Sequence, residues 1–388
     1  MTTINGLTGF LPRPERVREV VAPPYDVIKP GTPLESLLKA RGGNLWHVTL
    51  GPDPLSALAE LTASTLTPLT TPSFLVYEQT WTTTQGAQRR IGVFTATQVT
   101  DYARGEVIRH EKTFDDKVQG RLTLTRQTGL TLEPVFLLTR AAITPVLDRV
   151  AASRAPDYDL TPDFAGLNDL HGLRSRIWLV AEDSADGREL RALVATQPLY
   201  IADGHHRYHA ALKNGQSHCL AYVVERASIQ AYNRVITGVK PFAEVKAQLA
   251  LTPATWATPA KGHVRILHQG QAWDYAFRTI PQDVVGSLDC SCLERELYPL
   301  LGLTHAMIKD HAHFDYYAEW ELPKMAEVVG RGDYDLAVAL HPVSIGELMA
   351  VADAGRRDSA IVMPEKSTFF APKILSGLVL YRHRSAMP

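Results

Sequence analysis

Short apolar runs of strand length alternate with helix-like segments along the whole 388-residue chain. Residues that favour strands fill Phe74–Trp81 and Arg90–Val99, whereas apolar residues and alanines at helical spacing fill Leu55–Leu66. Because the two patterns interleave throughout, they predict an α/β or mixed α+β fold. The longest clean apolar stretches, such as Ile374–Tyr381, are too short to span a bilayer, so we expect no membrane segment.

The expected elements group into three regions: an N-terminal α+β region with a β-hairpin (1–150), a core (151–245) and a C-terminal α/β region (246–388). The boundary follows from a loop-like, Pro- and Asp-containing stretch over Ala152–Gly166. Further helices are expected over Leu34–Ala40, Leu122–Thr128, Arg207–Leu212, Cys292–Leu300 and Glu319–Val329, and further strands over Glu133–Leu138, Arg176–Val180, Leu199–Ala202, Leu220–Val224, Leu336–Leu340, Ala360–Met363 and Gly377–Tyr381.

Charge and cysteine content limit the classes of partner and compartment. With 40 basic and 41 acidic residues the formal charge is -1, so no global field attracts nucleic acid or an anionic membrane. Three cysteines are too few and too unevenly placed for a disulfide framework, which favours a reducing compartment. The N-terminus lacks the apolar core of a secretory signal. We therefore expect a cytoplasmic protein.

The segment with the clearest chemistry is a turn between an expected strand and an expected helix, Asp203-Gly204-His205-His206-Arg207. A helix N-terminus presents unpaired backbone N–H groups and partial positive charge, which together favour an anion. Gly204 allows close approach of a ligand, and His205, His206 and Arg207 add side-chain donors, the last as a planar fork. The turn therefore predicts a phosphate site, although an ordinary helix cap would use the same Asp-Gly pair.

This turn also resembles known proteins. The string from Ala202 to Ala211 resembles the signature turn of the ParB/sulfiredoxin superfamily, and Asp-Gly-His-His-Arg is typical of free serine kinases in that superfamily. The resemblance implies a ParB/sulfiredoxin-like core with a strand–turn–helix phosphate site, plus additional α/β segments.

Other strings are similar to one bacterial and archaeal family, the domain-of-unknown-function 1015 family. They are Ala22-Pro23-Pro24-Tyr25-Asp26-Val27-Ile28, His110-Glu111-Lys112-Thr113, Glu133-Pro134-Val135-Phe136 and the stretch from Met363 to Lys373. Together they span nearly the whole chain. The resemblance implies a kinase for free serine that uses pyrophosphate or a nucleotide.

Phosphoryl transfer requires cations around the phosphates, usually Mg²⁺, and a carboxylate that takes the proton of the acceptor hydroxyl. Glu111 is the expected general base, with Asp26 and Asp203 as further catalytic carboxylates and Asp203 also as a metal ligand. Tyr25 and His110, beside two of these carboxylates, are expected to bind substrate. A solvated charge run at Glu111 and simple turn or helix caps at Asp26 and Asp203 remain the alternatives.

A second segment, Lys366-Ser367-Thr368, lacks the glycine-rich loop of a P-loop. By resemblance, Lys366, Ser367 and the nearby Lys373 are expected to approach the same donor, whereas the alternative is a buried structural junction. A zinc site formed by Cys290 and Cys292 with His305, His311 and His313 is not expected, because the cysteine spacing is wrong.

The leading hypothesis is a phosphotransferase that moves a phosphoryl group from pyrophosphate or a nucleotide to a small hydroxylated metabolite, with free L-serine preferred. The alternatives are a ParB-like nucleotide-binding regulatory module and a phosphohydrolase. Contact with nucleic acid is not expected, because the charge is near neutral and no helix-turn-helix is recognisable. Asp26, Glu111 and Lys366 are expected to converge on a ligand at Gly204.

Overall fold

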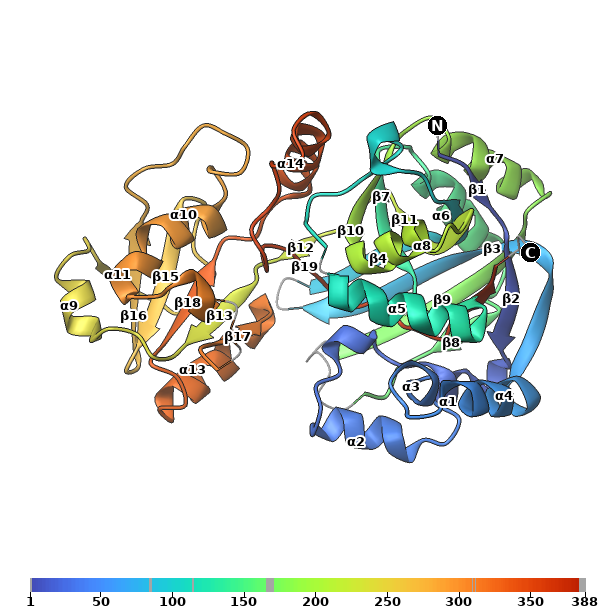
Figure 1. Cartoon of the computed structure of the whole chain (residues 1–388), viewed down its shortest axis with the longest axis horizontal. Helices are drawn as coiled ribbons and strands as arrows, with labels where there is room; N and C mark the ends of the chain where they lie inside the picture. The colour runs from blue at the N-terminus through green and yellow to red at the C-terminus, as the bar shows by residue number, and fades with distance from the viewer. Residues whose placement is uncertain are drawn as a thin grey trace. The chain divides into compact units, whose positions relative to one another are not determined.

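The computed structural model describes residues 2–83, 86–113, 115–164, 171–308, 310 and 312–383. The chain divides into two compact units, the first made of Met1–Ala227 with Pro372–Pro388 and the second of Ser228–Ala371. Each unit contains its own sheet with helices packed on it (Figure 1). The mixed α/β class predicted from the sequence is confirmed.

The first unit is built on a mixed sheet whose main path runs β5-β10-β7-β11-β4-β3-β2-β20-β6. At its centre β3 (Leu66–Thr83) and β4 (Gly86–Gln98) form a long antiparallel hairpin in which Leu75 pairs with Phe94. Parallel and antiparallel neighbours then alternate, because β11 runs parallel to β7 and β10 runs parallel to β5. The other strands are β1 (Ile4–Asn5), β2 (Leu7–Pro12), β5 (Val107–Ile108), β6 (Leu130–Thr131), β7 (Val135–Thr139), β8 (Tyr158–Leu160), β9 (His171–Ala181), β10 (Leu199–Asp203), β11 (His218–Val224) and β20 (Leu380–Arg382).

Several helices of the first unit begin at a side-chain cap. Thr32 accepts a hydrogen bond from the Glu35 N–H at the start of α2, and Asp53 accepts one from the Ser56 N–H at the start of α4, each followed by a proline at the first helical position. The helices are α1 (Val17–Val20), α2 (Pro33–Ala40), α3 (Trp46–Thr49), α4 (Pro54–Ser64), α5 (Asp115–Thr128), α6 (Thr144–Ser153), α7 (Ala185–Val194) and α8 (His205–Lys213), with 3₁₀ turns at Pro14–Arg16, Tyr25–Val27 and Tyr102–Arg104.

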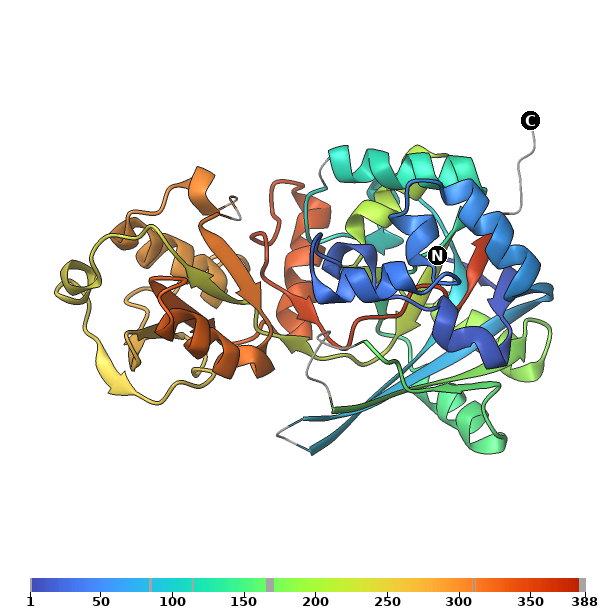
Figure 2. The ribbon, with the colours of Figure 1, turned by 90° about the horizontal axis from the view of Figure 1, so that it is seen from below.

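Two apolar clusters hold these helices on the sheet. One joins the inner strands to α6, α7 and α8 through residues such as Leu147, Leu190 and Tyr208. The other joins the N-terminal helices to β2, β6 and β20 through Leu38, Leu61 and Leu380. In Figure 2 the blue N-terminal helices lie on one side of the long β3–β4 ribbon, and the green helices α6 and α7 lie on the other. Burying both faces explains why β7 and β11 are almost continuously apolar.

The second unit contains a six-stranded sheet in the order β14-β16-β15-β18-β13-β17, with antiparallel neighbours. The strands of this sheet are β13 (Asn233–Ile236), β14 (Thr252–Ala254), β15 (His263–His268), β16 (Gln271–Ala276), β17 (Phe314–Tyr317) and β18 (Leu336–Leu340). The unit also contains a separate two-stranded sheet, in which β12 (Ile229–Gln230) and β19 (Phe369–Phe370) pair with each other. Its helices are α9 (Phe242–Lys246), α10 (Asp289–Glu296), α11 (Tyr298–Leu301), α12 (His305–Ile308), α13 (Leu322–Gly330) and α14 (Ile345–Arg357), with a 3₁₀ turn at Glu319–Glu321.

The units differ from the three regions expected from the sequence. The expected boundary near residue 151 separates β3 from β9, yet these two strands pair over Ser73–Thr82 in one sheet. The end of the chain, expected in the C-terminal region, returns to the first unit, where β20 pairs with β2 and β6. Pairing between strands far apart in sequence leaves no local signal, so composition alone misplaced both divisions.

Local expectations were more accurate, although several elements differ from them. Residues 360–363 form no strand, and helix α14, which ends at Arg357, was not expected. The expected strand at Gly377–Tyr381 is limited to β20 at Leu380–Arg382. Helix α8 begins at His205 rather than Arg207, because Gly204 already serves as the N-cap. Among the described residues, no helix is long and apolar enough to cross a membrane.

Candidate functional site

The turn between β10 and α8 depends on a glycine in a left-handed conformation. Gly204 has φ +92° and is the N-cap of the nine-residue helix α8, which receives no side-chain cap. A Cβ at this position would lie 3.0 Å from Nε of Arg207 and 3.3 Å from Cα of Val135. The turn therefore requires glycine both for its backbone angle and for the close approach of neighbouring atoms.

The three residues after Gly204 lie in the first turn of α8, so their side chains diverge instead of converging on one ligand. Successive helical residues are rotated by roughly 100°. His205 is buried and faces His110 and Glu111, His206 is partly exposed, and Arg207 donates to the carbonyl oxygen of Pro134. The expectation of three donors side by side is therefore corrected to one imidazole directed inward, one near the surface and one guanidinium folded back over Gly204.

Asp203 lies between two cations at the end of β10. Its Oδ2 accepts a hydrogen bond from Nζ of Lys373 at 3.0 Å, and its Oδ1 lies 3.5 Å from Nη2 of Arg207. Burial alone would raise the pKa of Asp203, but Lys373 and Arg207 together hold it below its ordinary value. The carboxylate is thus ionised and charge-compensated. It fixes Lys373 and Arg207 beside the turn.

The second part of the site is a cluster of His110, Glu111 and His205, which we call the His–Glu–His cluster. Glu111 Oε1 lies 3.6 Å from His110 Nε2, and Glu111 Oε2 lies 3.6 Å from His205 Nδ1. The two imidazole rings meet edge to face, with centroids 4.6 Å apart. Both histidines are buried, whereas 31% of the Glu111 side chain is exposed. One carboxylate thus bridges two buried imidazoles and still reaches solvent.

The protonation states in this cluster follow from burial and from neighbouring charge. Burial lowers the pKa of His205 to about 3, helped by repulsion from His110 and opposed by Glu111 and Asp203. His205 is therefore neutral at pH 7. Burial would raise the pKa of Glu111, but the neighbouring imidazoles of His110 and His205 lower it to about 2. Glu111 is thus a carboxylate near neutral pH, as its expected role as a general base requires.

Tyr25 and Asp26 lie on the 3₁₀ turn after two prolines, close to the same residues. The Tyr25 N–H donates to Glu133 Oε1 at 2.9 Å, and its ring stacks under the guanidinium of Arg121, 3.8 Å from the centroid. Burial raises the pKa of Tyr25. Asp26 is exposed, and its charge acts on both Tyr25 and Arg207. The structure thus places the first family-like string beside the turn.

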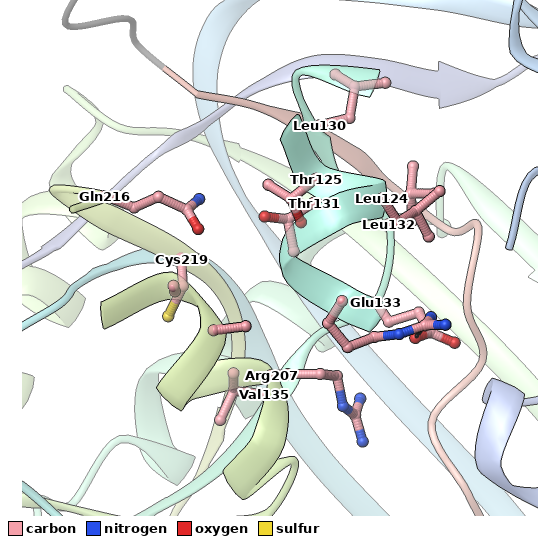
Figure 3. A pocket seen from close by; sticks show the side chains of 13 residues that line it. Leu124, Thr125, Leu130, Thr131, Leu132, Glu133, Val135, Arg207, Gln216 and Cys219 are labelled. Carbon is pink, nitrogen blue, oxygen red and sulfur yellow. Dashed lines mark hydrogen bonds and ion pairs between the residues drawn. The ribbon is translucent and has the colours of Figure 1, made fainter. Parts of the chain in front are cut away.

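A small cavity lies behind the turn, between α5 and α8. Its volume is about 30 Å³, which suits one water molecule rather than a nucleotide. Figure 3 shows Arg207, Val135 and Glu133 at one end, and Leu130 and Gln216 toward the other. The cavity therefore supports the back of the site and does not hold the substrate.

Lys366 and Ser367 belong to the second unit, where their contacts are local. The ammonium of Lys366 lies 5.4 Å from the ring centroid of Tyr232 and 5.7 Å from that of Tyr316. The Ser367 hydroxyl donates to the carbonyl of Pro364 and accepts from the Cys290 thiol at 3.2 Å. Within this unit the residues form a packed junction. Their expected approach to the donor stays a prediction.

The disfavoured zinc alternative gains no support in the described residues. Cys290 and Cys292 are buried free thiols, and Cys292 contacts backbone carbonyls and Arg295. His311 lies outside the described residues. In the parts of the chain that the structure describes, the group of side chains suited to a metal is the His–Glu–His cluster instead.

The sequence analysis assigned no role, or only a brief one, to some residues that lie at the site. Glu133 is buried and joins the Tyr25 N–H, Ser376 and Arg121, while the Pro134 carbonyl holds Arg207. Lys373, expected to approach the donor, pairs with Asp203 at the end of β10. Glu133, Pro134 and Lys373 all fall inside the family-like strings, so those strings were the available signal.

Three of the four family-like strings, and the end of the fourth, lie close to the turn. Those around Tyr25, Glu111 and Glu133, together with Lys373 at the end of the last string, lie around the turn in the first unit.

A family described as "protein of unknown function (DUF1015)" matches residues 4–291. The chain belongs to the DUF1015 family. A search of curated proteins gave no significant match, and the likeness to ParB stays a prediction.

Several solved structures are similar to this DUF1015 chain, all at low identity. A free serine kinase in complex with AMP is 10% identical, with 72% of this chain and 87% of that chain covered and a TM-score of 0.36. A conserved hypothetical protein from Pyrococcus furiosus is 13% identical, with 73% and 92% covered and a TM-score of 0.36. SbnI with a C-terminal truncation, from Staphylococcus aureus, is 12% identical, with 73% and 85% covered and a TM-score of 0.38.

Proposed function

We propose that this DUF1015 protein is a phosphotransferase that moves a phosphoryl group from pyrophosphate or a nucleotide to a small hydroxylated metabolite, with free L-serine as the preferred acceptor. One observation carries the proposal. His205 is the first residue of α8, at the anion-binding end of the helix, and its Nδ1 lies 3.6 Å from the Glu111 carboxylate. A phosphate at the turn and an acceptor hydroxyl at Glu111 would therefore be neighbours.

In the proposed reaction the donor phosphate binds the N-terminal turn of α8, where the backbone N–H groups and the helix dipole favour negative charge. Lys373 and Arg207, held by Asp203, add fixed positive charge beside it. The acceptor oxygen forms a bond to the terminal phosphorus of the donor, and the bond from that phosphorus to the bridging oxygen breaks. The leaving phosphate or nucleotide takes the electron pair.

The hydroxyl proton goes to Glu111. Its low pKa makes it a weak base, but phosphoryl transfer passes through a loose transition state in which positioning and electrostatics dominate. An ionised carboxylate that is 31% exposed can orient the hydroxyl and accept the proton as the new bond forms. Neutral His205 leaves that negative charge available.

The expected Mg²⁺ does not fit Asp203 well. Mg²⁺ prefers nearly octahedral oxygen ligands, but the two oxygens of Asp203 already face Lys373 and Arg207. In the His–Glu–His cluster two of the three ligand atoms are imidazole nitrogens, which Mg²⁺ does not favour. The described side chains around the turn therefore suit Mg²⁺ poorly.

The experiment is incubation of the full chain with L-serine and either pyrophosphate, ADP or ATP, each with and without Mg²⁺. Product analysis by ³¹P NMR and mass spectrometry should find O-phosphoserine with at least one donor. Release of phosphate without O-phosphoserine would instead identify a phosphohydrolase. If no donor yields O-phosphoserine or another phosphorylated alcohol, the phosphotransferase proposal is wrong.

Glu111→Gln tests the proposed base within the same assay. It keeps the size of the side chain and removes the carboxylate, so kcat should fall by about 10²–10⁴-fold while the KM for the donor changes little. Asp101→Asn, an exposed carboxylate that caps a 3₁₀ turn in the first unit, is the matched control and should keep full turnover. Full turnover in Glu111→Gln would remove Glu111 from this role.

A further inference from the structure

The His–Glu–His cluster has the spacing of a transition-metal site. Two ligand atoms that each lie about 2.1 Å from one tetrahedral ion are separated by about 3.4 Å. The observed separations are 3.6 Å for His110 Nε2 to Glu111 Oε1 and 3.6 Å for His205 Nδ1 to Glu111 Oε2. One ligand atom from each residue can be chosen so that all three lie within 4.8 Å of one another. Small side-chain rotations would bring them around one ion.

An independent observation is the state of His110. Its side chain is fully buried, yet neither ring nitrogen has a hydrogen-bond partner among the described residues. Leaving a buried polar group without a partner costs free energy, because the group loses its hydrogen bonds to water and gains none in return. Nε2 lies toward the Glu111 carboxylate without reaching hydrogen-bond distance. A cation between the two side chains would satisfy that nitrogen.

Binding of an ion at this cluster requires a change in the proton position of His205. Its Nε2 lies 3.5 Å from the N–H of His110, at the outer limit of a hydrogen bond, so in the ion-free state the ring proton belongs on Nδ1. An ion bound at Nδ1 moves that proton to Nε2 and breaks this weak contact. The loss is small compared with a metal–imidazole bond.

We propose that His110, Glu111 and His205 bind a divalent first-row transition ion, with Zn²⁺ as the reference ion, and not Mg²⁺. Two imidazoles and one carboxylate suit Zn²⁺, Mn²⁺, Fe²⁺ or Co²⁺. Three protein ligands leave a fourth position for water or a substrate oxygen. The exposed part of Glu111 gives that position a path to solvent.

Ion binding also has a regulatory consequence, and this part rests on the proposed function. A carboxylate that ligates an ion cannot at the same time accept the acceptor's proton. Loading with Zn²⁺ therefore lowers turnover of the phosphotransferase, and a chelator selective for transition ions over Mg²⁺ restores it. The ion and the acceptor compete for one carboxylate.

The test is a binding measurement that needs no turnover. The full chain is freed of metal by a chelator, dialysed, and titrated with Zn²⁺ and with Co²⁺ in the presence of excess Mg²⁺. We expect one ion per chain, a tetrahedral or five-coordinate Co²⁺ absorption spectrum, and no displacement by Mg²⁺. His110→Ala and Glu111→Gln should each weaken binding by at least about 10–100-fold, the loss typical even for residues that only support a ligand.

His209→Ala is the matched control, because it removes another imidazole from α8, one that stacks on Tyr102 outside the cluster. It should bind Zn²⁺ like the parent chain. Circular dichroism checks the fold of each variant, and Glu111→Gln covers the case in which loss of buried His110 disturbs folding. Absence of stoichiometric Zn²⁺ and Co²⁺ binding, or unchanged binding in Glu111→Gln, would overturn the site.

The two proposals fail separately. Zn²⁺ binding without any phosphorylated product leaves the metal site standing and removes the phosphotransferase. Phosphorylated product without Zn²⁺ binding does the reverse. If both hold but Zn²⁺ leaves turnover unchanged, then Glu111 is not the proton acceptor.

Discussion

His205 connects the two halves of the candidate site. Its backbone starts α8 immediately after Gly204, while its side chain lies against Glu111 and His110. The sequence suggested that this histidine would help to hold a phosphate. Buried and neutral near pH 7, it instead supports the Glu111 carboxylate. In the proposed function, the phosphate contacts are therefore left to the partly exposed His206, to Arg207 and to the backbone N–H groups.

The lowered pKa of His205 predicts a pH dependence of stability. His205 binds a proton near pH 6.5 in the unfolded chain but only near pH 3 in the folded chain. The free energy of unfolding therefore falls as the pH falls below 6.5. Between pH 6.5 and about 5.5 the carboxylates of the unfolded chain remain mostly ionised, because the ordinary pKa of a glutamate is 4.5. The histidine contribution there should approach a slope of about 1.4 kcal/mol per pH unit.

Urea unfolding of the metal-free chain at pH 7, 6 and 5, compared with His205→Gln, isolates this contribution. The variant should lose less stability over this window than the parent. His383, whose pKa burial lowers to about 4, adds a similar dependence, so His383→Gln is the comparator. Parallel pH curves for the parent and His205→Gln would show that His205 is not buried in its neutral form.

Arg207→Lys tests the guanidinium at the turn. Lysine keeps the charge but loses the planar fork that contacts Asp203 and the Pro134 carbonyl together. We expect the KM for the phosphate donor to rise by about tenfold, equivalent to about 1.4 kcal/mol, with kcat nearly unchanged. Steady-state kinetics should distinguish Arg207→Lys from Glu111→Gln. The first should change mainly the donor KM, and the second should change mainly kcat. Unaltered donor KM even in Arg207→Ala would remove Arg207 from donor binding.

At the scale of elements, α8 is positioned by contacts at several places along its length. The Tyr208 hydroxyl donates to the Thr100 carbonyl and accepts from the Thr100 N–H, both at 2.9 Å, and its ring lies in the main apolar cluster. Arg207 ties the same turn to the loop before β7 through the Pro134 carbonyl. The helix N-terminus is thus fixed relative to two neighbouring connections, as a preorganised anion site requires.

Gly204→Ala should damage this element more than an equivalent change at its other end. Gly204 has φ +92° and close neighbours in Arg207 and Val135, whereas Gly215, after the C-terminus of α8, has φ +67° and open space around it. Both variants incur the strain of a left-handed alanine, of order 1–3 kcal/mol. Only Gly204→Ala must also displace Arg207. Urea unfolding and donor binding should therefore both worsen more in Gly204→Ala, and equal effects would count against close packing at the turn.

At the scale of the whole molecule, the first unit is closed by the last described residues of the chain. Buried Arg90 donates to the carbonyl of Pro372, and Gln79 Nε2 donates to the carbonyl of Lys373 at 3.1 Å. These contacts hold the returning segment where Lys373 meets Asp203. A few residues later, β20 completes the sheet between β2 and β6. The site therefore depends on residues separated by 170 positions in sequence.

Leu380→Ala tests this closure. Leu380 is fully buried in the cluster that joins the N-terminal helices to β2 and β6, so its truncation should cost about 2–5 kcal/mol despite its place near the chain end. Leu55→Ala, at a leucine that is 53% exposed on α4, is the control and should change the free energy of unfolding by less than about 0.5 kcal/mol. Chemical denaturation measures both. A small effect at Leu380 would mean that β20 does not complete the core.

Local patterns predicted most of the longer elements, because caps, prolines and apolar periodicity act within a few residues. The helix over Leu34–Ala40 is α2 with one more residue, and Leu336–Leu340 is β18 as expected. The expectation for α8 missed its first two residues, since the pattern does not reveal that Gly204 adopts positive φ and serves as the N-cap. Helix α14 was missed, although a capping box between Ser344 and Glu347 marks its start.

The sequence by itself determined the mixed α/β class, the family and the turn at Asp203–Arg207, because each rests on short contiguous strings. Only the tertiary structure decided where those side chains point. It directed His205 toward Glu111, set Lys373 against Asp203 and made Glu133 a buried partner of Tyr25. The physical reason is that helix rotation and strand pairing set these directions. Both depend on burying apolar surface between segments far apart in the chain, which local composition does not encode.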